Sequence, residues 1–344
     1  MQAKLDKTPG AAPRTRQMQR RSAALAMGLA MALGAAGWAG PAAAQEAYPA
    51  RPVKLIVPFA PGGATDVIGR LMAQRLTDSM KVQVVVDNRP GAGSVLGTDL
   101  AAKAPPDGYT LVMTNGSAIT TGPHLRPSMP YRPMDDFVHV ALIGTFPNAF
   151  VVRTENPLKS FADFVAQARA RPGTVNYSSA GVGSAGFLTG EMLNQRASTA
   201  MTHIAYKGTG PATVDLLGGQ IDALFDGLPT ATTQARAGKV RVLAVTGARR
   251  VAAFPDVPTM NEVVPGVVGE AWFGISVPAR TPAPVVERLE AEILRIVNAP
   301  EVQARLVELG MAPLALGQKD FVPFLRADSE RWGPVIKAAN IKVE

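Results

Sequence analysis

Short apolar runs alternate along the chain with stretches in which apolar residues recur at helical spacing. The run 53–59 predicts a buried strand, and Val67, Ile68, Leu71, Met72 and Leu76 then share one face of a helix. Strands that alternate with helices favour an α/β fold with a mainly parallel sheet. In the first half we expect strands at 53–59, 82–87 and 109–114, with a second helix ending near Ala104.

The same pattern starts again after residue 150. Strands are expected at 141–144 and 149–153, where the chain passes onward, and then at 175–179, 201–206, 221–225, 240–246 and 273–278. Helices are expected at 160–171, 187–195, 211–217, 282–298, 300–309 and 318–339. The repeated plan predicts two α/β lobes, with a C-terminal part that folds back onto the first lobe.

The first 44 residues have the pattern of an export signal. Four arginines precede an uncharged apolar run at 23–39, and small residues follow up to Ala44. We therefore predict a secretory signal cleaved after Ala44. The run is too short and too rich in Ala and Gly to favour a membrane anchor. Sec or twin-arginine export, and a start at Met1 or Met18, both stay open.

Charge and cysteine content exclude several functions. The net charge of the chain is +8, but residues 1–44 hold six Lys or Arg and one Asp, so 29 basic and 26 acidic residues remain, or +3. Residues 45–344 contain no dense run of basic residues, so the charge pattern does not indicate nucleic-acid binding. Cysteine is absent, which excludes disulfides, thiol catalysis and thiolate metal sites.

Gly181, Gly183 and Gly186 spell G-x-G-x-x-G after a predicted strand and before a predicted helix. A dinucleotide site needs an acidic residue about 20 positions on, at the end of the next strand. Here that strand ends Ala205-Tyr206-Lys207, without a carboxylate. The motif is therefore weak evidence for a nucleotide.

Four similar glycine loops, each after a strand and before a helix, suggest another ligand. They lie at 61–66, 90–94, 181–184 and 207–211. Unpaired backbone N–H groups at a helix start favour an anion, and glycine lets a ligand approach them. Ordinary βα turns are the alternative for any single loop. Four loops in matching places predict a pocket for a small anion.

Catalytic residues are poorly supported. His124, His139 and His203 are scattered without ligand spacing, and Ser184 lacks the first glycine of a nucleophile elbow. Asp66 either favours the helix dipole or orders donors at the pocket. We expect a protein that is not an enzyme and has no metal or cofactor.

Several motifs follow one another along the chain, and their combination is more specific than any single motif. They include VPFAPGGATD (57–66), DNRPGAG (87–93), PDGYTL (106–111), YKG (206–208) and DLLGGQID (215–222). This combination closely resembles the Bug-type substrate-binding proteins of tripartite tricarboxylate transporters. The likeness runs from about Tyr48 to the C-terminus. Ser94 stands where many relatives continue with glycine.

The resemblance implies a type II periplasmic-binding-protein fold: two α/β lobes, joined by two crossing strands, with a ligand cleft between them. It places the first lobe at 45–148 plus 269–344 and the second at 149–268. It implies a small organic carboxylate bound through amides, hydroxyls and water, and no cofactor. Carried over by position, the ligand-binding residues are Phe59, Gly62, Gly63, Asp66, Asn88, Gly91, Gly93, Thr114, Ser117, Ser179, Gly181, Ser184, Tyr206 and Asp226. Among them, Gly91 and Gly93 would shape the mouth of the pocket.

The function expected from this resemblance is that of a monomeric periplasmic receptor, which delivers an organic acid to the permease subunits of a tripartite tricarboxylate transporter. Two alternatives stay open: a receptor that signals to a sensor protein, and a secreted α/β enzyme using Asp66 or Ser184. The sequence does not identify the carboxylate.

Overall fold

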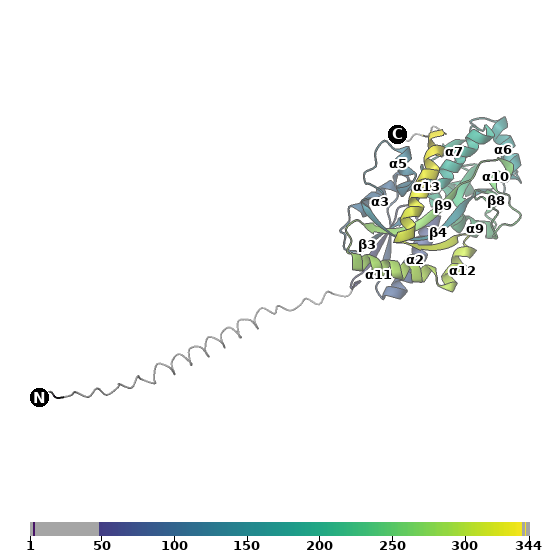
Figure 1. Ribbon diagram of the computed structural model, residues 1–344. Coiled ribbons are helices and arrows are strands. Elements are labelled where there is room, and N and C mark those ends of the chain that lie inside the picture. The colour runs from purple at the N-terminus through teal and green to yellow at the C-terminus, as the bar shows by residue number, and fades with distance from the viewer. Residues whose placement is uncertain (1–2, 4–47, 339–340, 342–344) are drawn as a thin grey trace. The chain divides into compact units, whose positions relative to one another are not determined.

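The computed structural model describes residues 48–338, together with residues 3 and 341 (Figure 1). The predicted signal segment, with its cleavage site after Ala44, lies outside the described residues. No helix among the described residues combines the length and the apolar character that crossing a membrane requires.

The first lobe is built on a sheet whose strands come from both the N-terminal and the C-terminal parts of the described chain. β1 (Val53–Val57) lies between β2 (Val84–Asn88) and β3 (Thr110–Thr114) and runs parallel to both. β9 (Glu270–Pro278) lies antiparallel between β3 and β4 (Phe137–Arg153). β10 (Ala312–Gly317) also pairs with β4. The C-terminal segment therefore returns to the sheet of the N-terminal half.

The second lobe is built on a second sheet, which shares β4 with the first. The far half of β4 pairs antiparallel with β7 (Ala223–Gly227) and β8 (Val240–Val245). β5 (Asn176–Ser178) lies between β7 and β6 (Thr202–Ile204) and is parallel to both. The path across both sheets is β2-β1-β3-β9-β4-β7-β5-β6.

The two separate strands expected at 141–144 and 149–153 are wrong, because β4 is one strand of 17 residues. In the structure Pro147 pairs with Glu270 at the end of the β4–β9 ladder, and Asn148 begins the pairing with β7. A proline is tolerated at such a position because the ladder ends there.

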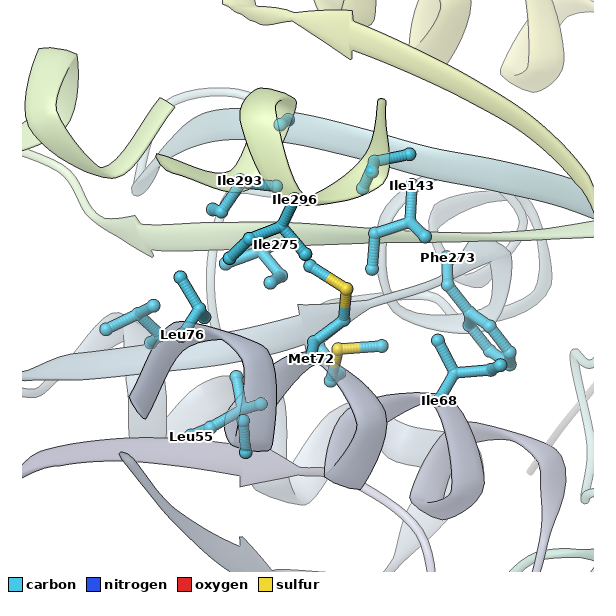
Figure 2. Close-up of a cluster of buried hydrophobic side chains, with 14 of the residues drawn as sticks. Leu55, Ile68, Met72, Leu76, Ile143, Phe273, Ile275, Ile293 and Ile296 are labelled. Carbon is cyan, nitrogen blue, oxygen red and sulfur yellow. The ribbon is translucent and has the colours of Figure 1, made fainter. Parts of the chain in front are cut away.

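Helices cover both faces of the first sheet. On one face α2 (Ala64–Met80) and α11 (Ala283–Val297) pack over the strands, and α12 (Pro300–Glu308) follows. Figure 2 shows side chains of α2, such as Met72, meeting Ile275 of β9 and Ile293 of α11. The other face carries α3 (Val95–Ala102), α13 (Gln318–Ala338) and the short helices α4 (Gly116–Ile119) and α5 (Gly122–Leu125).

The second sheet is covered in the same way. Phe150 packs with Phe161 and Phe164 of α6 (Phe161–Ala170), on the face that α7 (Ala185–Ala197) and α10 (Met260–Val263) also cover. The next residue of β4, Val151, faces the opposite layer, formed by α8 (Thr209–Leu217) and α9 (Leu228–Arg236). Neighbouring residues of a strand point to opposite faces, so continuous apolar strands fit two-sided burial.

The sequence pattern did not predict α4, α5, α9, α10 or β10. Three of these helices have only four residues each. α9 is rich in threonine and buries small side chains such as Ala231. Elements this short or this polar carry little periodic signal.

Candidate functional site

A cavity between the two lobes is bordered by the N-terminal ends of four helices. α2 contributes Gly63, Ala64 and Thr65, and α7 contributes 184–186. Thr209 at the start of α8 and Gly227 just before α9 complete the set. First-turn N–H groups have no partner within their helix and carry a partial positive charge. The cavity is therefore suited to an anion.

Two side-chain amides add hydrogen-bond donors to this lining. Asn115 follows β3 and is 5% exposed, and Asn148 lies on β4 and is 6% exposed. The Nδ2 atom of each is buried and has no hydrogen-bond partner within the described part of the chain. Buried polar groups are normally paired, so two unpaired donors in one cavity fit a ligand or a water molecule that accepts hydrogen bonds.

Aromatic side chains form much of the remaining wall. Phe59, Phe146 and Phe273 line the cavity together with Trp272 and Trp332. The lining that the described residues provide contains no Lys, Arg or His. An anion bound here would rely on backbone N–H groups, amides and hydroxyls rather than on an ion pair.

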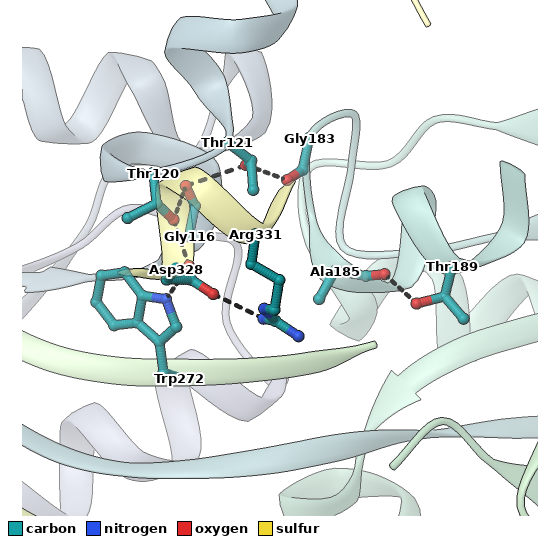
Figure 3. Close-up of polar contacts among 9 residues, drawn as sticks. All are labelled: Gly116, Thr120, Thr121, Gly183, Ala185, Thr189, Trp272, Asp328 and Arg331. Atoms are coloured by element: carbon teal, nitrogen blue, oxygen red, sulfur yellow. Dashed lines mark hydrogen bonds and ion pairs between the residues drawn. The ribbon is translucent and has the colours of Figure 1, made fainter. Parts of the chain in front are cut away.

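Two acidic residues, Glu270 and Asp328, border the same cavity, and hydrogen bonds hold the side chain of Asp328 (Figure 3). It accepts from Thr120 Oγ1 at 2.6 Å and from Trp272 Nε1 at 2.9 Å. Arg331 Nη2 donates to its other oxygen at 2.7 Å. Its charge is thereby balanced within the first lobe, and Trp272 is fixed as part of the wall.

The glycine loops of the two lobes touch each other across the cleft. Loop 61–66 meets loop 207–211, where Ala60 N donates to Lys207 O at 2.8 Å. A Cβ on Gly210 would lie 2.1 Å from Pro61 O, and one on Gly93 would lie 2.2 Å from Val182 O. Glycine is required at both positions because backbones of opposite lobes approach there. The lobes are thus closed on one another.

The predicted site residues fall into distinct groups. Phe59, Gly63, Ser117 and Ser184 line the cavity. Ser184 also caps α7, since its Oγ accepts from Phe187 N at 3.2 Å.

Gly62, Asp66 and Asn88 lie in and behind the first glycine loop. Asp66 accepts from Gly62 N at 3.0 Å and from Asn88 Nδ2 at 2.9 Å. Burial alone would raise the pKa of Asp66, but hydrogen bonds from Arg70, Gly62 and Asn88 lower it below the usual value. This ionised carboxylate orders the loop from behind, outside the cavity lining.

Gly93 and Gly181 belong to the contact between the loops of the two lobes, and Gly91 lies in the same loop as Gly93. An added Cβ on Gly181 would come within 2.9 Å of Tyr206 O and 3.6 Å of Gly93 Cα. Gly91, at φ +148°, packs against Leu96. These three glycines shape the edge of the cleft and do not line the cavity.

Four predicted residues form hydrogen bonds with partners in their own lobe. Thr114 Oγ1 lies 3.3 Å from Ser276 Oγ, and Tyr206 donates to Asp215. Ser179 Oγ lies 2.9 Å from His203 Nε2, and burial lowers the pKa of His203 to about 4. Asp226 accepts from Thr230 Oγ1 at 2.6 Å, and burial raises its pKa to about 6. None of the four lines the cavity.

The sequence reasoning missed Thr121, Asn148 and the two tryptophans, and it named the neighbours of Asn115 but not Asn115 itself. Of these residues, Asn115 could have been found from the sequence, because it directly follows a predicted strand at the edge of the sheet where ligands bind. Nothing local marks Asn148, which lies inside β4. Trp272 and Trp332 come from β9 and α13, far from the glycine loops in sequence.

Two α/β/α lobes closed on a cavity that is ringed by helix N-termini define a two-lobe solute-binding protein. The family model described as "Tripartite tricarboxylate transporter family receptor" matches residues 68–341. The chain belongs to this family, which is a class of receptors and not of enzymes. The fold class and the family predicted from the sequence are therefore confirmed.

Relatives of known name or structure resemble the chain over most of its length. It is 38% identical to Protein BugT of Bordetella pertussis, over 90% of this chain and 95% of BugT. An R. palustris protein solved with adipate is 33% identical, with a TM-score of 0.83 over 86% of this chain and 99% of its own. MatC from Rhodopseudomonas palustris, solved with bound malate, is 31% identical, with a TM-score of 0.79 over 84% of this chain and 100% of MatC.

Proposed function

We propose that this protein is a periplasmic receptor that captures a small organic carboxylate between its lobes. One observation carries the proposal: four helix N-termini and two orphan amide donors border a single inter-lobe cavity, whose described lining lacks cationic side chains. Carboxylate oxygens accept several hydrogen bonds, and helix N-termini favour negative charge. The adipate and malate in the solved relatives are of this chemical class.

Binding would select the closed arrangement over an open one. The first lobe, at 45–148 plus 269–344, contributes Phe59, Gly63 and Ser117, and the second, at 149–268, contributes Ser184. A ligand that touches both lobes binds the closed form more tightly and shifts the population toward it. Gly62, Asp66, Asn88, Gly91, Gly93, Thr114, Ser179, Gly181, Tyr206 and Asp226 would act on the ligand through the shape and order of these loops.

The same proposal places the protein in a transport system. The segment 1–44 would direct export to the periplasm, and the closed, liganded monomer would deliver its acid to the permease subunits of a tripartite tricarboxylate transporter. The support is membership of the receptor family. No catalytic step is proposed, since the polar residues of the lining act as hydrogen-bond donors and acceptors.

A thermal-shift panel on residues 45–344, stripped of carried-over ligand by unfolding and refolding, tests the function. The panel would contain acetate, succinate, malate, adipate, citrate, glutamate and nicotinate. A ligand at 100 times its Kd stabilises the native state by about 2.7 kcal/mol, so the true class should raise Tm by several degrees. The diamide of the best acid serves as the control and should give no shift. A panel without any shift contradicts the proposal.

A further inference from the structure

We propose that Ser94 is a positioning residue, which orients the side-chain amide of Asn115 so that Nδ2 donates to an oxygen of the bound carboxylate. The inference rests on the proposed function and deepens it. It assigns to this cavity a side-chain donor and the group that holds that donor in place.

The side-chain amide of Asn115 has one atom that is hydrogen-bonded and one that is not. Its Oδ1 accepts from Ser94 Oγ at 3.1 Å, while its buried Nδ2 has no partner within the described part of the chain. In this arrangement the Ser94 hydroxyl donates to the amide oxygen, which leaves the amide nitrogen as the unpaired end. Asn115 borders the cavity and is 5% exposed, so its unpaired amide nitrogen lies at the cavity wall, shielded from bulk solvent.

Ser94 adopts an unusual backbone conformation for this contact. It has φ +81° and ψ −10°, a region that residues other than glycine occupy at a cost, and it is fully buried. It stands at the N-cap of α3, where serine commonly accepts from the first-turn N–H groups. Its side chain makes no such capping bond and turns to Asn115 instead. Strained residues of this kind cluster at ligand sites.

The surroundings of the pair favour an anionic oxygen as the partner of Nδ2. Gly116 and Ser117, the next residues of the chain, also line the cavity, and Gly116 lies beside Thr121 in Figure 3. Helix N-termini border the same space. A ligand group that only donates would leave Asn115 Nδ2 unpaired, so the donor selects for an acceptor such as a carboxylate oxygen.

The test measures the affinity of ligand-stripped protein for the panel acid that wild type binds most tightly, by titration calorimetry. Ser94→Gly and Ser94→Ala should each weaken binding about tenfold, because the hydrogen bond from Asn115 to the charged carboxylate would no longer be held in a favourable orientation. Asn115→Ala should weaken it about tenfold or more. Asn115→Asp, which replaces the donor by a negative acceptor, should weaken binding further than Asn115→Ala does.

A double-mutant cycle separates positioning from general damage. In the Asn115→Ala background, Ser94→Gly should cause no additional loss, because the group that it orients is gone. Ser198→Gly is the matched control: Ser198 also has a positive φ, of +50°, but it ends α7 away from the cavity. This variant should bind as wild type does.

Failure of the inference and failure of the proposed function give different results. Wild-type affinity in Ser94→Gly and Ser94→Ala, or additive losses in the cycle, would overturn the role of Ser94 while the receptor function stands. Wild type that binds no acid of the panel would overturn both. Unfolding transitions of the unliganded variants verify that each one is folded.

Discussion

Thr121 Oγ1, in the first lobe, donates a hydrogen bond of 2.7 Å to Gly183 O, in the second lobe (Figure 3). The bond is buried and lies next to the cavity, which Thr121 also lines. It joins the two lobes directly, without a ligand atom between them. Part of the free energy of closure is therefore supplied by the protein itself.

Thr121→Val should shift the protein toward an open arrangement. The loss of one buried hydrogen bond costs about 1 kcal/mol, which would weaken carboxylate binding about fivefold. Calorimetry measures the affinity, and small-angle scattering should give a larger radius of gyration for the unliganded variant. Thr189→Val is the matched control, since Thr189 donates only within α7, to Ala185 O at 2.6 Å. Equal affinities of Thr121→Val and wild type would contradict the role of this bond.

Gly93→Ala should block closure at the rim. The added Cβ would lie 2.2 Å from Val182 O, so the opposing loops must separate. We expect at least a tenfold loss of affinity, together with about 1 kcal/mol of destabilisation from alanine at φ +61°.

Gly238→Ala isolates the steric part of this effect. Gly238 has φ +68°, and a Cβ there meets nothing within 4 Å. It should lose similar stability in urea unfolding while its affinity stays that of wild type. If Gly93→Ala and Gly238→Ala bind equally well, the rim contact has no role in closure.

Asp226→Asn should alter the pH dependence of stability. The folded-state pKa of Asp226, about 6, lies above that of an unfolded Asp, so the folded state holds this proton more tightly. This group therefore stabilises the fold at low pH, and the stabilisation is lost as pH rises from about 4 to 6. The advantage of the Asn variant over wild type should grow by about 2 to 3 kcal/mol between pH 4 and pH 7.

Urea unfolding of both proteins at several pH values measures this difference. His139 and His203, with pKa values of about 4, act in the opposite sense and destabilise the fold as pH falls. They are common to both proteins and cancel in the comparison. A difference in unfolding free energy that does not change with pH would show that Asp226 is ionised in the folded state at pH 4.

Ligand binding should change the intrinsic tryptophan fluorescence. Residues 45–344 contain only Trp272 and Trp332, and both line the cavity. Trp332→Phe leaves Trp272, whose Nε1 is fixed to Asp328, as the single reporter. Titration with the best acid should shift its emission to the same saturation point that calorimetry gives. An unchanged spectrum at saturation would place the ligand elsewhere.

Most of the fold could be predicted from local pattern, and the exceptions have a common cause. The helix at Ala64–Met80 and the strand at Val53–Val57 were expected, because each has the apolar period of its own element. β4 was expected as two strands, because the local sequence does not show which strands it pairs with. Its continuity depends on β9 and β7, which follow more than 70 residues later.

The site was predicted less completely. Phe59, Gly63, Ser117 and Ser184 lie at strand-to-helix turns, and the resemblance of the chain to the Bug-type family marked them. The glycine loops were expected to bare amides to a ligand and Gly93 to shape the mouth of the pocket; in the structure Gly93 and Gly210 allow one lobe to touch the other. The sequence shows where a glycine stands, but the atom that a side chain at this position would strike belongs to a distant segment of the chain.

The sequence by itself determined most of the alternating α/β elements, the family and three of the helix starts that border the cavity, those of α2, α7 and α8, since these depend on local periodicity, turn residues and ordered motifs. Loop 90–94, also expected at the pocket, does not line it, and the start of α9, which does, was not expected. Only the tertiary structure decided which donors remain free: it paired Ser94 with Asn115, left the amides of Asn115 and Asn148 unsatisfied, and joined Thr121 to Gly183. The physical reason is that hydrogen-bond satisfaction and close packing are properties of groups brought together in space, often from residues far apart in the chain.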